Sequence, residues 1–312
     1  MRLDEDGHPY RTCGTMQVFE RLLEEDPRFR MREAELEDAM QRLVGSRTEG
    51  QEYIRQIRCV VHVVYHDEAE NIPVEQIYSQ IVVLNDDFGS TNFDVEKTPE
   101  VWRPLVIDSG IRFILADIDP YGAPTVGITR TETSVPEFES DDAVKFTSRG
   151  GRDAWPSDRY LNIWVCPLGR GLLGYAQFPE GPSATDGVVL LHSAFGSNGT
   201  AASPYDLGRT STHEVGHWLG LRHIWGDANN CSGSDFVADT PNQQLPNFRA
   251  PSFPHISCSN GPNGDMFMNY MDYVRDAEMY MFTSGQVLRM NAVLEGARSE
   301  VFDQIMPDDG GC

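Results

Sequence analysis

Apolar residues recur at two different periods along this chain, and they predict its elements. The run IRCVVHVVY at 57–65 is continuous and β-branched, which predicts a buried strand. The next apolar residues recur at helical spacing and predict an amphipathic helix that ends near Gly89. They are Ile77, Ile81, Leu84 and Phe88. Further apolar runs between glycine- and proline-rich turns predict strands at 111–118, 161–166 and 187–192. Strands and a long helix in this order favour a mixed α/β sheet.

The second half of the chain changes from strands to helices and loops. The short run LLGYAQFP at 172–179 ends in proline, which suits a strand at a sheet edge. A helix is predicted over 207–219, and the following residues 224–267 are dominated by Gly, Asn, Asp and Pro, as loops are. A last helix is expected to begin at a capping-box pattern formed by Thr283 and Gln286, with an apolar stripe of Val287, Met290 and Leu294.

Residues 1–47 differ from the rest of the chain. A short cysteine-containing loop precedes two helix-like stretches, 16–25 and 32–43, that are rich in glutamate and arginine. Because this block has too few apolar residues to fold alone, we expect it to pack against the remainder. The segment SRTEG at 46–50 is typical of an exposed linker, and Arg47 is a candidate cleavage point there, with the cut bond within several residues on either side.

The charge of the chain narrows its possible partners. Among 312 residues, 48 Asp and Glu outnumber 25 Lys and Arg, for a net charge of −23, which repels phosphate backbones and argues against nucleic acid. This excess of acidic residues can serve solubility, the binding of calcium or the recognition of basic substrates. No apolar run reaches the roughly 20 residues of a membrane helix, so no membrane partner is expected. The acidic start lacks the apolar region of a signal peptide, which leaves the route of export open.

The six cysteines form no regular ladder of pairs. Cys231 and Cys258 share the loop-rich segment and are expected to form a disulfide. Cys59 and Cys166 lie inside strand-like runs and are interpreted as buried thiols. Cys312 at the C-terminus is either free or joins two chains.

One segment carries the chemistry: His213-Glu-Val-Gly-His217-Trp-Leu-Gly220-Leu-Arg-His223. On a helix, positions i and i+4 share a face, so His213 and His217 can bind one ion. Gly220 can take a positive φ, end the helix and return His223 as a third ligand. Three protein ligands leave one position for water, which is the pattern of a catalytic zinc site. A shorter HExxH motif arises often by chance; three histidines, a glutamate and a glycine at set spacing do not.

The spacing also assigns a role to Glu214, which is turned away from the ligand face by one residue. Zinc lowers the pKa of bound water from 15.7 towards about 7 and polarises a carbonyl oxygen. A carboxylate beside the ion can take the proton of the attacking water and pass it to the leaving amine. The segment therefore predicts a zinc-dependent endopeptidase with Glu214 as general base.

Three runs together resemble the pappalysin family of metzincins: HEVGHWLGLRHIWGD, DFVADTPNQ and MFMNYMDY. The resemblance covers roughly residues 57–300. It implies an α/β (α+β) metzincin fold, in which a twisted, mostly parallel sheet with a backing helix and the active-site helix forms an upper lobe. A smaller, irregular lower lobe would hold the Met-turn and the C-terminal helix.

By the same likeness, Met271 is the Met-turn methionine beneath the zinc ligands, and Tyr273 stabilises the tetrahedral intermediate. From the residues alone, either can be ordinary core packing. Substrate is expected to lie extended between the lobes and to pair with the edge strand near 174–178, where Gly174, Tyr175 and Ala176 would bind it.

Cys13, in Arg-Thr-Cys-Gly-Thr, resembles the cysteine switch of the family. Its thiolate would fill the fourth zinc position and keep the enzyme latent; the alternative is an unpaired thiol on a flexible terminus. The resemblance then divides the chain into a pro-segment (1–50), an N-terminal catalytic lobe ending in the zinc motif (51–223) and a C-terminal lobe (224–312). It implies a secreted protein, expected to be a monomer, whose own pro-segment is its inhibitor.

Calcium and specificity are the least determined features. Oxygen ligands are available at Asp227 and Asp235, and relatives bind calcium near the DTP run, which points to Asp239 and Thr240; the alternative is a solvated acidic loop. Relatives carry a second disulfide near the Met-turn, where this chain has Glu278. Asp276 or Glu278 would favour Arg or Lys at P1′, whereas Met279 would line an apolar pocket.

Two rival functions remain for such a chain. One is an inactive binding module that keeps the metzincin fold for interaction. The other is a zinc amidase that acts on non-peptide substrates. Protein and peptide substrates are the expected partners, because every group that peptide hydrolysis needs is present in the motif.

Overall fold

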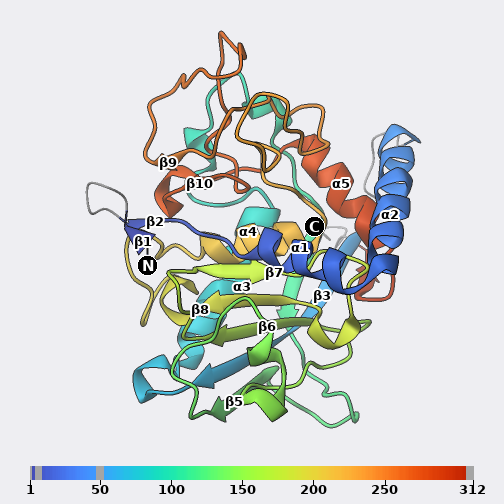
Figure 1. Cartoon of the computed structure of the whole chain (residues 1–312), viewed down its shortest axis with the longest axis vertical. Coiled ribbons are helices and arrows are strands. Elements are labelled where there is room, and N and C mark those ends of the chain that lie inside the picture. The colour runs from blue at the N-terminus through green and yellow to red at the C-terminus, as the bar shows by residue number, and fades with distance from the viewer. Residues whose placement is uncertain (1, 4–8, 47–52, 307–312) are drawn as a thin grey trace, which may run out of the picture.

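The computed structural model describes residues 2–3, 9–46 and 53–306, and a seven-stranded sheet forms the larger of its two lobes (Figure 1). The long strand β3 spans Ile54–Tyr65, and the residues predicted to be buried there are fully so, including Val61 and Val63. The other strands of the sheet are β4 (Ile111–Leu115), β5 (Ile128–Glu132), β6 (Leu161–Cys166), β7 (Gly174–Ala176), β8 (Val188–Leu191) and β11 (Phe302–Ile305).

The sheet is mixed and mostly parallel, as predicted. Its main path runs β11–β3–β6–β8–β7, and β4 and β5 also pair with β3. Strand β3 is parallel to β4, β5 and β6, and β6 is parallel to β8. Only β11 against β3 and β7 against β8 are antiparallel. Strand β7 is therefore the edge of the sheet, next to the boundary between the lobes.

Two helices connect the sheet to the site. Helix α3 (Val74–Phe88) buries its predicted stripe against β4 and ends where the Gly89 N–H bonds Asn85 O. Helix α4 (Arg209–Trp218) contacts β7 and β8, and all of its residues are buried. Burial on every side means that α4 lies between the sheet and the second lobe rather than on a surface.

The N-terminal residues pack on the rest of the chain, as their composition predicts. Strands β1 (Arg2–Leu3) and β2 (Pro9–Tyr10) pair with each other, and helices α1 (Thr15–Glu25) and α2 (Pro27–Ser46) follow. Apolar residues of α1 join a core cluster with residues of β6 and β7. In Figure 1 this blue segment crosses between the sheet and the loop-rich lobe, and α2 then lies beside α5 (Ser284–Glu295). Arg47, the candidate cleavage point, lies outside the described residues, as does Cys312.

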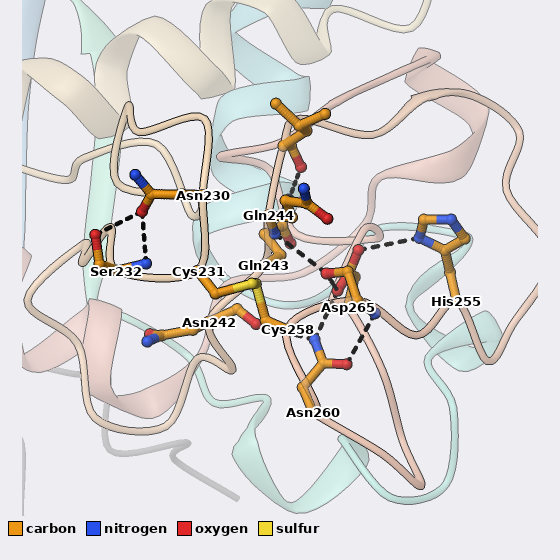
Figure 2. The surroundings of a disulfide bond; sticks show 12 residues. Asn230, Cys231, Ser232, Asn242, Gln243, Gln244, His255, Cys258, Asn260 and Asp265 are labelled. Carbon is orange, nitrogen blue, oxygen red and sulfur yellow. Dashed lines mark hydrogen bonds and ion pairs between the residues drawn. A yellow bond between two sulfur atoms is a disulfide. The ribbon is translucent and has the colours of Figure 1, made fainter.

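The second lobe consists mainly of loops. It contains one short parallel pair, β9 (Phe248–Arg249) with β10 (Tyr273–Val274), and helix α5. Cys231 and Cys258 form the predicted disulfide, and beside it Asp265 accepts hydrogen bonds from His255 and Asn260 (Figure 2). A covalent bridge and a buried carboxylate that gathers several donors hold these loops where regular structure is scarce.

Helix α5 begins as its sequence predicts. The Thr283 side chain accepts a hydrogen bond from the Gln286 N–H, and the Gln286 side chain reaches back to the Thr283 N–H. Single 3₁₀ turns complete the assignment at Glu68–Glu70, Val95–Lys97, Arg103–Leu105, Ala143–Lys145, Thr147–Arg149, Ser183–Thr185, His192–Ala194 and Asp276–Glu278. Among the described residues, no helix combines the length and apolar character that crossing a bilayer requires.

Strands β5 and β11 are not apparent in the hydrophobic pattern. Their sequences, ITRTE and FDQI, are half-exposed or exposed along most of their length. These strands form because they pair with backbone groups of β3, and not because they bury an apolar face. Cys59 and Cys166 are buried free thiols, as predicted.

Candidate metal centre and active site

Three histidine rings converge between α4 and the turn that follows it. The Nε2 atom of His217 lies 3.1 Å from that of His213 and 3.0 Å from that of His223. All three side chains are buried. Nitrogens bonded to one tetrahedral zinc ion at about 2.0–2.1 Å would be spaced at a similar distance.

The hydrogen bond made by Nδ1 of each ring identifies which tautomer is present. Every Nδ1 has an oxygen acceptor: Tyr270 O for His213 at 2.7 Å, Leu221 O for His217 at 2.7 Å, and Asp227 Oδ1 for His223 at 2.6 Å. Because these oxygens only accept, the proton of each neutral ring lies on Nδ1. The three Nε2 lone pairs then face one point without a proton among them.

This donor set fits a metal ion. Burial first, and then the neighbouring imidazoles, hold the pKa of His213 and His217 well below the usual histidine range, so the rings are neutral ligands rather than cations. Three unprotonated nitrogens this close would repel one another without a cation between them. Metal-bound histidines commonly donate their other N–H to a carbonyl or carboxylate in this way.

Glu214 lies next to this point, on the side of the edge strand. Its Oε2 accepts a hydrogen bond from Thr15 Oγ1 at 2.9 Å and lies 3.4 Å from Cys13 Sγ. Burial raises the pKa of Glu214 to about 7. Gly174 of β7 makes this placement possible, because a Cβ at that position would come within 2.9 Å of Glu214 Cγ.

Cys13 completes the group of potential ligands. Its Sγ and one nitrogen from each of the three histidines all lie within 4.8 Å of one another. Burial, and then the charge of Glu214, raise the pKa of the Cys13 thiol well above its usual value. The sequence places Cys13 some 200 residues from these groups, and only the fold brings it to them.

Two predicted structural residues lie where the chain must turn or approach closely. Gly220 has φ +83°, and a side chain there would meet Val293 at 2.8 Å. Met271 is fully buried under α4, and a Cβ on Gly216, between the first two histidines, would lie 2.6 Å from Met271 Sδ. The methionine thus supports the helix turn that carries the ligands.

Tyr273 borders the same site. Its ring centroid lies 5.0 Å from that of His223 and 5.7 Å from that of His213. Burial is the largest cause that raises its pKa well above 10, and a hydrogen bond with the backbone of Cys13 opposes this shift. The phenol is therefore protonated, and its ring packs against two of the three histidines.

The N-terminal segment lies along the edge strand like an added strand. Gly14 N donates to Gly174 O at 2.9 Å, Leu173 N donates to Thr12 O at 3.1 Å, and the bridge between Cys13 and Gly174 is parallel. Ala176 N donates to the Thr15 side chain at 2.8 Å. The backbone of β7 therefore binds the N-terminal segment, while the Tyr175 side chain is buried on the core side.

The side chain of Arg11 is buried close to His213, and we call the place that it occupies beside Asp276 the Arg11 pocket. Its guanidinium bonds Asp276 Oδ1 at 2.6 Å and Thr210 Oγ1 at 3.0 Å. Asp276 is fully buried, and its other oxygen accepts from the Leu207 and Arg209 N–H groups. Of the two carboxylates that the sequence left open, Asp276 and not Glu278 pairs with this arginine; Glu278 is half-buried at the end of the same 3₁₀ turn.

The residues considered for calcium have other partners in this structure. Asp239 accepts hydrogen bonds at the start of α5, from the side chains of Thr283 and Ser284 and from Gly285 N. Thr240 Oγ1 donates to Asp235 Oδ2 at 2.8 Å. Asp239 thus stabilises a helix N-terminus, where a carboxylate is favoured.

Sequence reasoning missed four contributors to the site. Asp227 was considered only as a calcium ligand, yet it orients His223. Arg11 and Thr15 were quoted only as neighbours of Cys13 in the RTCGT run, without roles of their own, and Thr210 was not considered. The sequence signal for Asp227 is its position four residues after the last histidine. The run around Cys13 marks Arg11 and Thr15 but not their partners, which are distant in sequence, and nothing local marks Thr210.

Comparisons with known proteins found a matching family and several relatives. Residues 146–295 match the peptidase M43 family, described as pregnancy-associated plasma protein-A. The chain is 37% identical over 198 residues to "Extracellular metalloprotease 1" of Coccidioides posadasii, covering 60% of this chain and 68% of that protein.

Two solved structures from Tannerella forsythia resemble the chain as a whole. A promirolysin mutant has a TM-score of 0.86 at 49% identity, covering 93% of this chain and 97% of that one. Mature mirolysin in complex with a cleaved peptide has a TM-score of 0.79 at 53% identity, covering 81% and 96%. The resemblance to the pappalysins and the metzincin fold are thereby confirmed. The chain belongs to the peptidase M43 family and is a metalloendopeptidase.

Proposed function

We propose that this chain is the latent form of a zinc endopeptidase that cleaves proteins before arginine or lysine. The observation that supports it most is the convergence of three unprotonated Nε2 atoms with Glu214 and Cys13 at one buried point. A binding module would not need a carboxylate held beside the metal ligands. A zinc amidase would not need an edge strand whose backbone binds an extended chain.

His213, His217 and His223 would hold the ion, and when bound, zinc would acidify a water molecule and polarise the scissile carbonyl. Glu214 accepts the proton of the attacking water at Oε2, which in the latent form faces Thr15 and Cys13. It then delivers that proton to the leaving amine. The phenol of Tyr273 donates a hydrogen bond to the oxyanion that develops on the former carbonyl.

Substrate binds along β7 after the N-terminal segment has left. The free backbone groups are then Gly174 O and Ala176 N, which now bond Gly14 N and the Thr15 hydroxyl. These groups recognise the substrate main chain regardless of sequence.

Latency arises from Cys13. With the ion bound, its thiolate would hold the fourth metal position and keep the nucleophilic water away; Thr15 bonds Glu214 at the same time. The domain division 1–50, 51–223 and 224–312 follows this role. Cleavage near Arg47 would release the segment, although that position lies outside the described residues.

Preference for a basic P1′ residue rests on the Arg11 pocket. Asp276 is buried and bonded to two backbone N–H groups, so its charge is fixed in place for a guanidinium or ammonium group. Arg11 marks the size of the side chain that fits.

The setting of the enzyme follows from its relatives and its loops. Secretion agrees with the extracellular proteases to which the chain is similar and with the disulfide in the loop-rich lobe. We expect a monomer. A structural calcium ion near Asp239 and Thr240 remains part of the proposal, and it would have to replace the hydrogen bonds that Asp239 now makes at α5.

The test is a metal-reconstitution assay on the full chain. The protein is purified, its zinc is quantified by elemental analysis, and a quenched peptide with arginine at P1′ is added after activation. Cleavage should vanish with a zinc chelator and return with about one equivalent of zinc. Cleavage that persists after complete removal of zinc would overturn the proposal.

A further inference from the structure

Helix α2 binds the catalytic body through a single stripe. Its less exposed positions recur every three or four residues, so they share one face. Most of these positions carry apolar or acidic side chains, with one arginine near the start: Phe29, Arg32, Glu33, Leu36, Glu37, Ala39, Met40 and Leu43. The mechanism of latency, which depends on Cys13, does not account for this second attachment.

Two glutamates of the stripe pair with two arginines beside the metal site. Glu37 receives both terminal nitrogens of Arg289, and these side chains are 13% and 4% exposed. Glu33 pairs with Arg222, the residue before the third histidine. Pairs so little exposed to water are screened far less than surface pairs.

Contacts other than those with α2 also orient the two arginines. Arg289 Nε donates to Gly220 O at 2.8 Å, which orients its two terminal nitrogens outward towards Glu37. The guanidinium of Arg222 stacks on aromatic rings, 4.8 Å from Phe19 and 5.1 Å from Phe178. Phe178 and Gly220 belong to the catalytic body, so part of this orientation survives loss of the N-terminal segment.

Apolar contacts flank the two pairs. Met40 is 3% exposed and packs with Ala292 and Val293 of α5. Leu36 and Leu43 pack against the same cluster. We call Arg222, Arg289, Ala292, Val293 and Phe236 the α2 seat; the Phe236 ring lies beneath both guanidinium groups, at 5.8 and 5.6 Å.

Removal of the N-terminal segment uncovers this seat. It presents two cations and an apolar strip on a protein whose net charge is −23. A cavity of about 680 Å³ already lies between α2 and the loop of Asp227, the residue that orients His223. The seat therefore adjoins the active site rather than a distant face.

The position of the α2 seat along the cleft follows from the path of the N-terminal segment. The N-terminal segment runs from Arg11 in the Arg11 pocket, past Cys13 beside the histidines, to Thr15 and α1. It then returns over the α2 seat as helix α2. A substrate with its P1′ side chain in the Arg11 pocket has its preceding residues on the Thr15 side. The seat is thus within reach of residues upstream of the scissile bond.

We propose that, in the activated enzyme, the α2 seat binds an acidic amphipathic helix of a protein substrate on the N-terminal side of the cleaved bond. This inference rests on the proposed protease activity and on release of the N-terminal segment. The helix that fits carries two glutamates four residues apart, with apolar residues between and beyond them, as α2 does. Recruitment of this kind raises the local concentration of the scissile segment at the cleft.

The test compares matched peptide substrates with the full chain after activation. One joins residues 27–46 of this chain, through a flexible linker of about 15 residues spanning ~21 Å, to a quenched segment with arginine at P1′. The second is identical except for Glu33→Gln and Glu37→Gln, and the third is the quenched segment alone. We expect a KM about tenfold lower for the first than for the second at equal kcat.

Two further measurements separate docking from other effects. The free peptide 27–46 should raise the KM of the first substrate and leave the third unchanged. Arg222→Gln should abolish the difference between the first two substrates, with kinetics on the third retained.

Equal KM values for the first two substrates, or equal inhibition of all three by the free peptide, would overturn the docking proposal. Failure to cleave even the quenched segment alone would instead count against the protease function.

Discussion

Gly174 on the edge strand lies directly against the side chain of Glu214: a methyl group at position 174 would come within 2.9 Å of Glu214 Cγ and 3.1 Å of Oε1. It would also come within 2.9 Å of Val189 O on the neighbouring strand. The absence of a side chain on β7 is therefore what lets the carboxylate stand between the strand and the metal ligands. This contact joins the two elements of the proposed mechanism, the backbone proposed to bind substrate and the carboxylate proposed to move its proton.

Gly174→Ala should displace that carboxylate and slow the chemical step. We expect kcat to fall about ten- to a hundredfold, because displacements near 1 Å at a reacting group cost this much, while zinc content stays at one equivalent. The measurement is steady-state kinetics with a quenched peptide. Gly296→Ala, whose new Cβ would lie no closer than 3.4 Å to its neighbours, is the control and should keep full activity. Unchanged kcat in G174A would show that Glu214 does not need this space.

Glu214→Ala should keep zinc and lose activity. The three histidines and their Nδ1 acceptors are untouched, so elemental analysis should still find the metal. Loss of the general base should reduce kcat by about 10²–10⁴-fold. Cleavage at nearly wild-type rate would show that another group moves the proton.

Cys13→Ala should shorten latency. The variant keeps Arg11 in its pocket and α2 on its seat, but it cannot offer a thiolate to the metal. We expect full-length protein to convert to the shorter form several-fold faster, followed by gel electrophoresis and N-terminal sequencing. Cys166→Ala removes a buried thiol of the sheet and should convert at the wild-type rate. Identical time courses for all three proteins would remove Cys13 from the mechanism of latency.

Asp276→Asn should change the P1′ preference. A neutral amide no longer compensates a buried cation, so kcat/KM for a P1′ arginine peptide should fall by about 10²-fold. A P1′ leucine peptide should change much less, which inverts the ratio of the two. Glu278→Gln removes the neighbouring carboxylate that does not pair with Arg11 and should leave the ratio intact. A preserved arginine preference in D276N would place the determinant elsewhere.

His62 should make the sheet sensitive to acid. It is fully buried between Thr129 and Asn162, whose Oδ1 accepts the Nε2 proton, and burial lowers its pKa to about 4. Because the folded pKa lies below the unfolded value of 6.5, its contribution to stability is complete above pH 6.5 and is lost as pH falls through about 4. The full difference is roughly 3 kcal/mol.

This contribution is isolated by comparing variants. The free energy of unfolding is measured between pH 6.5 and 4 for wild type, His62→Gln and His66→Gln, the latter at an exposed neighbouring histidine. The loss of stability on acidification should be smaller in H62Q than in the other two proteins. Parallel curves for all three would show that His62 does not charge in this range.

Much of this molecule is determined by local pattern. The continuous apolar run of β3, the stripe of α3 and the capping box of α5 each depend on residues close together in sequence, and each was predicted. The histidine spacing is equally local, because a helix and one glycine with positive φ suffice to bring His213, His217 and His223 together. The half-exposed strands β5 and β11 escaped prediction because pairing with β3, and not their own pattern, forms them.

The sequence by itself thus predicted the histidine cluster, the place of Glu214 beside it and the disulfide of the loop lobe. Only the tertiary structure decided that Asp276 rather than Glu278 meets Arg11, and that Asp239 accepts hydrogen bonds at the start of α5. The physical reason is that burial and partners far apart in sequence choose among carboxylates that are chemically alike. The role of a carboxylate depends on the hydrogen-bond donors around it, and these come together only when the chain folds.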